Sequence, residues 1–131
     1  MNIRPLHTIL IISTFYLVGC RPSEPEEIPL PTKICIKTSH HGQPIPEAKV
    51  WLKYNTDTFP GYDQPTSYFD ALIETGADAR GCIEPVPEGH HWLIAFGYDS
   101  LHFPNFVYGS MELNISVSGR AVVDTILYVS E

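Results

Sequence analysis

The amino-acid sequence predicts an all-β protein, an antiparallel β-sandwich of about seven strands. Short segments alternate apolar and polar residues with a period of two, as in MELNISVS (residues 111–118), and almost no segment has the 3.6-residue period of an amphipathic helix. Clusters that contain glycine and proline, of which the chain has 9 and 12, separate these segments and predict turns. Many short alternating strands joined by turns are typical of two packed antiparallel sheets.

The segments predicted as strands are residues 33–38, 48–54, 68–74, 82–84, 91–98, 111–118 and 120–131. Alternation places Ile34 and Ile36 on one face of the first strand, the face expected to point into the core. The segment HWLIAFGY (91–98) is apolar on both faces, which indicates a central strand that is covered on both sides. Ser118 and Gly119 are expected to turn the last two strands into a C-terminal hairpin.

Residues 1–19 have the layout of a secretory signal peptide. A short start carrying Arg4 precedes the apolar segment TILIISTFYLV (8–18), which is shorter than the roughly 20 residues of a membrane span. The tetrapeptide LVGC, which ends at Cys20, resembles the lipobox of bacterial lipoproteins. The resemblance implies cleavage before Cys20 and attachment of acyl chains such as palmitate, which together give durable membrane anchoring. The alternative is an ordinary signal peptide with Cys20 near the cut by chance.

The segment RPSEPEEIPLP (21–31) is rich in proline and glutamate, which favours an extended, semi-rigid linker between the lipidated N-terminus (20–31) and a β-sandwich domain (32–131). In bacterial lipoproteins, arginine after the cysteine, here Arg21, disfavours retention in the inner membrane. The expected location is therefore the bacterial envelope, at the cell outer membrane. The acidic residues of the linker are similar to export signals of surface lipoproteins, so surface display is a further hypothesis.

The charge of the chain argues against two classes of partner. The whole sequence has a formal charge of −7, and removal of residues 1–19 leaves 7 basic and 15 acidic residues, a charge of −8. Nucleic-acid binding needs clustered lysine and arginine, and no such cluster exists in the sequence. The same acidic balance disfavours electrostatic docking to anionic lipid, so the acyl chains alone are expected to hold the protein at the membrane.

Two of the three cysteines remain once Cys20 carries lipid. In an oxidising compartment the pair Cys35 and Cys82 is expected to form a disulfide, which would stabilise the fold by roughly 4 kcal/mol in the chain-entropy model. The alternative is two separate thiols, because the sequence does not show whether their Cα atoms approach each other.

Two stretches resemble transthyretin-like and carboxypeptidase regulatory-like domains, which are Ig-like β-sandwiches. HGQPIPEAKV (41–50) follows the pattern Gly-x-Pro-[Ile/Leu/Val]-x-[Gly/Asn/Asp]-[Ala/Val]-x-Val between two strands, although Glu47 or Ala48 stands where a glycine is common. TGADARGCIEPVPEGHHWLIAFGYDS (75–100) is similar to Thr-Asp-x-x-Gly, a short strand, Pro-x-Gly and a strand ending near Gly-Tyr, with one extra residue before Gly81. The resemblance covers about residues 32–130 and implies the fold much more than a function.

One enzyme with this resemblance, 5-hydroxyisourate hydrolase, uses histidine and arginine side chains beside a C-terminal Tyr-Arg-Gly-Ser. This chain has LYVSE (127–131) there, and KICIKT (33–38) where the enzyme carries a histidine on its first strand. Without those groups no proton-transfer arrangement carries over. We therefore expect no enzyme activity, no catalytic residue and no cofactor.

The histidine pairs His40–His41 and His90–His91, with His102 as a further donor, raise the hypothesis of a metal site. Adjacent residues of an extended strand point to opposite faces, so one pair rarely supplies two ligands to one ion. A site would need one imidazole from each pair and a carboxylate. The alternative, solvated histidines in loops and at strand starts, leads to the expectation of no metal.

Aromatic residues gather in FPGYDQPTSYF (59–69) and YDSLHFPNFVY (98–108). Loops at the end of a sandwich often carry recognition, and exposed rings give rigid contact area for glycans or proteins. The candidate ligand contacts are Tyr62, Tyr68, His102, Phe103, Phe106 and Tyr108. The alternative is that these rings cap the open ends of the core.

Three hypotheses for function follow. The first is a lipid-anchored, non-catalytic β-sandwich that acts in protein interaction or as an accessory component of the envelope. The second is a ligand-binding surface lipoprotein that uses the aromatic loops, with carbohydrate as the candidate ligand. The third is a transthyretin-like hydrolase or metal-binding protein built on the histidines. The expected partners are therefore the membrane and an envelope protein or glycan, and not nucleic acid.

The lipoprotein hypothesis predicts that cells expressing the protein incorporate labelled palmitate into it through Cys20. The Cys20→Ala variant should lose the label, because no sulfur remains at that position to be acylated. Labelling followed by immunoprecipitation and electrophoresis measures this directly. Label that persisted in the variant would contradict the hypothesis.

Overall fold

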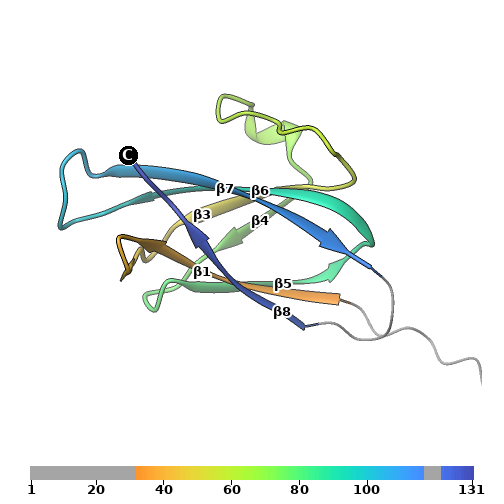
Figure 1. Cartoon of the computed structure of the whole chain (residues 1–131), viewed down its shortest axis with the longest axis horizontal. Helices are drawn as coiled ribbons and strands as arrows, with labels where there is room; N and C mark the ends of the chain where they lie inside the picture. Colours follow the sequence, from red (N-terminus) through yellow and green to blue (C-terminus); the bar gives the residue numbers. More distant parts are fainter. Residues whose placement is uncertain (1–31, 117–121) are drawn as a thin grey trace, which may run out of the picture.

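The computed structural model describes residues 32–116 and 122–131, and it confirms the all-β sandwich (Figure 1). The described residues form eight strands rather than seven, and one short 3-10 helix, η1 (Thr66–Tyr68). The strands are β1 (Thr32–His40), β2 (Gln43–Pro44), β3 (Lys49–Lys53), β4 (Ala71–Glu74), β5 (Arg80–Val86), β6 (Gly89–Tyr98), β7 (Phe106–Ile115) and β8 (Val122–Tyr128). Within these residues no helix has the length and apolar character needed to span a membrane. The predicted signal peptide and linker lie outside the described residues.

Strand β1 is the centre of the first sheet. It pairs with β5 in antiparallel fashion along one edge and with β8 in parallel fashion along the other, so that Lys37 lies between Arg80 and Ile126. The two-residue strand β2 turns back on the end of β1 and pairs Gln43 with His40. The β1–β2 turn uses backbone in the left-handed region, at His41 (φ 47°) and at Gly42 (φ 81°), as the predicted tight reversal requires.

The second sheet has the order β4-β3-β6-β7 and is antiparallel throughout. Its central strand β6 pairs over its whole length with β7, from Gly89 opposite Ile115 to Tyr98 opposite Phe106. Figure 1 shows the two sheets as stacked layers, with the loop between β3 and β4 lying over the outer side of the second sheet. That loop covers part of the face that points away from the core.

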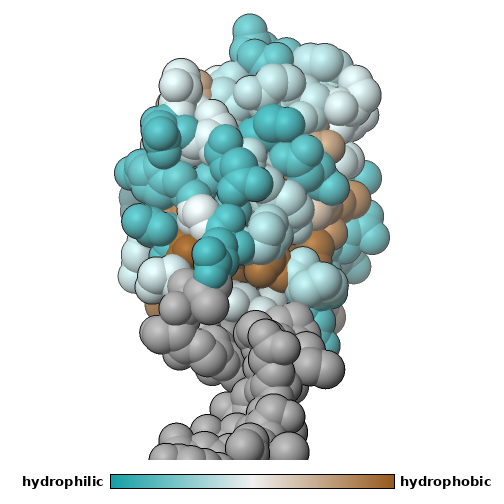
Figure 2. Space-filling view, turned by 90° about the vertical axis from the view of Figure 1, so that its right-hand side faces the viewer, coloured by the Kyte–Doolittle hydropathy of each residue, from teal (hydrophilic) through white to brown (hydrophobic). Residues whose placement is uncertain are grey.

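The hydrophobic core lies between the sheets and follows the predicted alternation. Ile34 and Ile36 of β1 have no exposed surface, as the period-two pattern requires. The other fully or almost fully buried core residues include Ile45, Ala48, Val50, Leu52, Ile73, Leu93, Ala95, Val107, Ile115 and Leu127. At the end of the sandwich that faces the viewer in Figure 2, hydrophilic side chains predominate, with hydrophobic ones showing between them in the lower half. The core is thus closed on this side largely by polar residues.

The disulfide predicted between Cys35 and Cys82 is confirmed. The two residues lie directly opposite each other on β1 and β5, with their Cα atoms 4.1 Å apart. Both are on the outer face of the first sheet, because their neighbours Ile34 and Ile36 point into the core. The bond therefore fixes the register of two strands instead of joining distant loops.

The predicted C-terminal hairpin is wrong. β7 starts earlier than expected, at Phe106, and pairs with β6, whereas β8 belongs to the other sheet and runs parallel to β1. Alternation predicts which residues face the core but not which strand is the neighbour, and the edge of β1 that β8 occupies would otherwise remain unpaired. The predicted turn residues Ser118 and Gly119 lie outside the described part of the chain.

The end of β8 crosses β7 at Gly109, where the two sheets approach each other. Tyr108 and Ser130 exchange two backbone hydrogen bonds of 2.9 and 2.8 Å beside it. A Cβ atom at Gly109 would lie 3.0 Å from the Cα atom of Val129 and closer still to the carbonyl oxygen of Tyr128. Only glycine lets these two backbones approach so closely.

Gly109→Ala should therefore lower the free energy of unfolding by about 1–3 kcal/mol, because backbone atoms must shift. Urea denaturation of the purified chain measures this. Gly76→Ala is the matched control, since its new Cβ would meet first the exposed side chain of Asp78, at 3.2 Å, and should change stability by less than about 0.5 kcal/mol. Equal stabilities of the two variants would contradict the close crossing.

Candidate functional site

Aromatic side chains cover the outer face of the second sheet. Because Leu93, Ala95 and Val107 point into the core, the residues that alternate with them on β6 and β7 point outward. The outward apolar and aromatic residues of β3, β6 and β7 are Trp51, Trp92, Ile94, Phe96, Tyr98, Phe106 and Tyr108. The sequence predicts that HWLIAFGY is covered on both sides. This is confirmed for the half of its outer face that lies under the β3–β4 loop.

The β3–β4 loop covers that half. Phe59 packs edge-on against Trp92 with ring centroids 5.1 Å apart, and Ile94 beside it has no exposed surface. Tyr62 packs against Tyr108 at 4.7 Å, and its hydroxyl lies 3.0 Å from the hydroxyl of Ser110. The loop therefore acts as a second layer over the start of β6, and further along it Phe69 packs against Trp51 with ring centroids 5.9 Å apart.

Beyond Tyr62 the aromatic face is open and forms a hollow of about 290 Å³. The residues around it are Glu47, Lys49, Trp51, Phe96, Gly97, Tyr98 and Phe106. Phe96 and Phe106 stack with centroids 6.0 Å apart, and Tyr98 meets Phe106 edge-on at 5.5 Å. The floor and walls are mainly aromatic, while Glu47 and Lys49 add one carboxylate and one amine at the rim. We call this surface the aromatic face.

The structure separates the predicted contact residues into two groups. Phe106 belongs to the aromatic face, and Tyr62 and Tyr108 lie beside it, packed against Phe96 and Phe106 respectively. Tyr68 lies at the periphery of the same sheet, with the Lys53 ammonium 4.7 Å from its ring centre. His102 and Phe103 are in the β6–β7 loop at one end of the sandwich, and Phe103 is 95% exposed.

Of the residues around the hollow, only Phe106 was among the predicted contacts; those missed in the sequence are Glu47, Lys49, Trp51, Phe96, Gly97 and Tyr98. Trp51 and Phe96 alternate with core residues within predicted strands. Their aromatic side chains at outward positions could have indicated a binding surface from the sequence alone. The alternative that the rings cap the ends of the core does not hold for Tyr62, Phe106 and Tyr108, because these side chains lie on the outer face of the second sheet.

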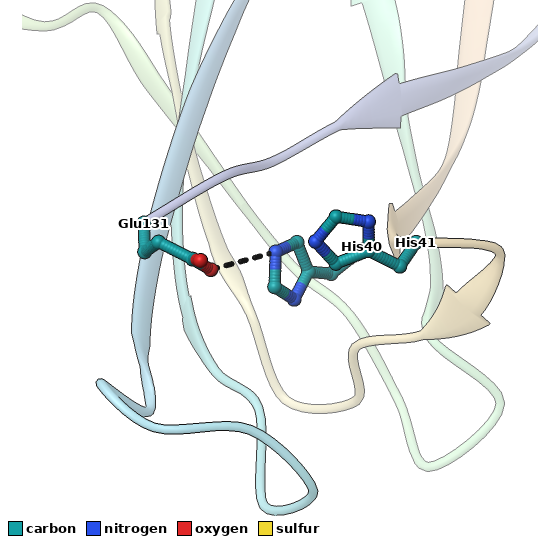
Figure 3. Close-up of side chains that lie close together, drawn as sticks. All are labelled: His40, His41 and Glu131. Atoms are coloured by element: carbon teal, nitrogen blue, oxygen red, sulfur yellow. Dashed lines mark ion pairs between the residues drawn. The ribbon is translucent and has the colours of Figure 1, made fainter.

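A second site, the histidine cluster, lies where β1, the β6–β7 loop and the residues after β8 meet. His40, at the end of β1, is 1% exposed, and its Nδ1 atom lies 2.7 Å from Oδ2 of Asp99. The same oxygen lies 2.8 Å from Nδ1 of His102. On the other side of the His40 ring, Oε2 of Glu131 is 3.1 Å from Nε2, and the His41 ring is close by (Figure 3).

Asp99 is the centre of this cluster. It is 2% exposed, and its other oxygen, Oδ1, accepts a hydrogen bond of 2.8 Å from the backbone N–H of Leu101. The hydrogen bond with the His40 ring holds the pKa of Asp99 well below its usual range, the bonds from Leu101 and His102 act in the same direction, and burial opposes them. Asp99 is therefore a carboxylate that accepts from three N–H groups.

The second histidine pair does not take part. His91 is fully buried and both of its ring nitrogens have backbone partners: Nδ1 accepts from the N–H of Asn55, and Nε2 donates to the carbonyl of Pro87. His90 lies on the outer face between Asp57 and Glu112, one on each ring nitrogen. The predicted combination of one imidazole from each pair is thus not formed, whereas both members of the His40–His41 pair are together.

No family model matches this sequence, and no curated protein is significantly similar to it. Among solved structures, the crystal structure of a proposed carbohydrate-binding protein from Pseudomonas aeruginosa is similar, with a TM-score of 0.48 and 13% identity. The similarity covers 82% of this chain and 98% of that one. Similarity at this level does not indicate the ligand of this chain.

The lowered pKa of Asp99 predicts a specific dependence of stability on pH. A carboxyl group whose pKa is lower in the folded state stabilises the fold fully above its unfolded value, 3.8, and this contribution is lost as the pH falls below that value. Asp99→Asn should therefore show a shallower fall in its urea midpoint than the wild type between pH 5 and roughly pH 2.

The exposed residue Asp57, which contacts His90 at the surface, gives the control. Asp57→Asn should keep the pH dependence of the wild type, because solvent screens an exposed pair. Parallel curves for the wild type and Asp99→Asn would contradict the role assigned to Asp99.

Proposed function

We propose that this protein is a lipid-anchored β-sandwich of the bacterial envelope that binds carbohydrate on its aromatic face. The observation that carries the proposal is the open hollow of about 290 Å³, with aromatic walls and a charged rim. It lies on the outside of the second sheet, away from the core, so packing of the sandwich does not require these rings. Exposed aromatic surface of this kind, rimmed by polar groups, is typical of a binding site.

Sugar rings suit this surface in both shape and chemistry. The C–H faces of a sugar are apolar and flat and pack against aromatic faces, here those of Trp51, Phe96 and Phe106. The hydroxyl groups at the edge of a sugar need hydrogen-bonding partners, which Glu47, Lys49 and the Tyr98 hydroxyl supply. The volume is at the lower end of the roughly 300–1,000 Å³ of ligand pockets, which fits one or two sugar units.

The backbone at Glu47 supports a role for that residue. Its φ is 54°, in the left-handed region, where a residue with a Cβ atom costs about 1–2 kcal/mol relative to the right-handed region. The sequence patterns similar to this segment commonly have a glycine here or at the next position, Ala48. A strained residue that carries a carboxylate into a hollow is a reason to infer function, because glycine would fold more easily at this position.

Protein interaction remains the second candidate. Tyr98 is 67% exposed and Phe106 is 44% exposed, and such rings also serve as anchors in protein interfaces. The shallow hollow favours a small rigid ligand over a flat protein surface. A direct binding experiment separates the two.

Glycan-array binding by the full chain in detergent should give selective signals, and Phe106→Ala should weaken the best of them at least tenfold, about 1.4 kcal/mol. Phe103→Ala is the matched control, because this phenylalanine is 95% exposed and lies off the aromatic face. Its affinity should equal that of the wild type.

Glu47→Gln should also weaken binding while leaving the backbone conformation as it is, because the substitution keeps the shape of the side chain. An array without selective signals would contradict carbohydrate binding and leave protein interaction as the better hypothesis. Equal loss in Phe106→Ala and Phe103→Ala would contradict the aromatic face as the site.

A further inference from the structure

We infer that the histidine cluster binds a divalent transition-metal ion. The ligands are Nε2 of His40, the ring of His41 and the carboxylate of Glu131, and Asp99 is the positioning residue that holds the His40 ring. The sequence led to the expectation of no metal. Three features of the structure argue for the ion: the orientation of the rings, an unpartnered buried nitrogen and the turn at His41.

Asp99 determines which nitrogen of each ring is free. Its Oδ2 atom lies 2.7 Å from Nδ1 of His40 and 2.8 Å from Nδ1 of His102. A carboxylate only accepts hydrogen bonds, so both rings donate through Nδ1–H. Each neutral ring then carries its lone pair on Nε2, which is the arrangement of a carboxylate–histidine–metal triad.

The free nitrogen of His40 faces another acceptor. Nε2 is buried and makes no hydrogen bond, although Oε2 of Glu131 lies 3.1 Å away. A lone pair and a carboxylate oxygen at this distance repel each other unless a metal ion or a proton lies between them, and no N–H···O hydrogen bond joins these two atoms. Two ligands of a tetrahedral zinc ion are about 3.3 Å apart for bonds of 2.0–2.1 Å, so the observed separation suits a shared metal.

The turn after β1 brings the second imidazole to the same place. His41 has left the extended strand with a φ of 47°, and its ring centre lies 4.2 Å from that of His40. One donor atom each from His40, His41 and Glu131 can be chosen so that all three lie within 4.8 Å of one another. Figure 3 shows the two rings and the carboxylate converging from β1 and from the residues after β8.

The donor set selects the class of ion. Two imidazoles and one carboxylate suit zinc and its neighbours in the first transition row, whereas calcium and magnesium prefer oxygen alone. The His102 ring, held by the same carboxylate, has its centre 5.5 Å from that of His40 and 5.7 Å from that of His41. A site with three protein ligands leaves a fourth coordination position open.

His90 offers a natural control within the same chain. Like His40, it has one carboxylate on each ring nitrogen, Asp57 on Nδ1 at 2.7 Å and Glu112 on Nε2 at 2.9 Å. Unlike His40, it belongs to no group of three donor atoms that lie within 4.8 Å of one another among the described residues. A surface histidine with acidic neighbours is therefore present in the chain without the geometry of a site.

The test is zinc binding to the full chain in detergent, without a polyhistidine tag, measured by competition with a chromophoric chelator. The wild type should bind one Zn²⁺ per chain. Glu131→Gln and His41→Asn should each weaken binding at least tenfold, and Asp99→Asn by about 10–100-fold through the orientation of the ring. His90→Gln should leave the affinity unchanged.

His41 and Glu131 are exposed, so their variants should keep the fold, and circular dichroism of each checks this. Absence of stoichiometric zinc binding by the wild type would overturn the inference. Undiminished affinity in folded Glu131→Gln and His41→Asn would also overturn it, as would loss of binding in His90→Gln. Zinc binding and glycan binding are measured separately, so either proposal can fail alone.

Discussion

The fold depends on the double pairing of β1. This strand has β5 on one edge and β8 on the other, and its inward residues supply the core from Ile34 to His40. The disulfide locks its register to β5 at Cys35. A shift by one residue would turn every core side chain of β1 toward solvent, so this register determines both the core and the position of the end of the strand.

The histidine cluster follows from that constraint. Because β8 runs parallel to β1, both strands end at the same end of the sandwich, and Glu131 arrives beside His40. The loop after β6 brings Asp99 to the other side of the same ring. Thr32, where β1 starts, lies at the opposite end of the strand from the cluster.

The sequence was sufficient for the fold class because alternation reports directly which residues are buried. It did not predict the partners of β7 and β8, since alternation carries no information on the neighbouring strand. The rule that adjacent histidines point apart holds only in extended backbone, and His41 has a positive φ. Asp99 and Glu131 come from segments remote in sequence, so no local pattern could place them beside His40. Similarly, Trp51 and Phe96 line one hollow only because β3 and β6 pair.

The most direct measurement is anomalous diffraction at the zinc edge from a crystal of the protein soaked in zinc. It tests the parallel β1–β8 arrangement and the site together, because only that arrangement puts Glu131 beside His40. The structure predicts an anomalous peak about 2.1 Å from Nε2 of His40 and in contact with His41 and Glu131. A map without a peak at this end of the sandwich, or with a peak only at His90, would contradict the convergence of these residues on one ion.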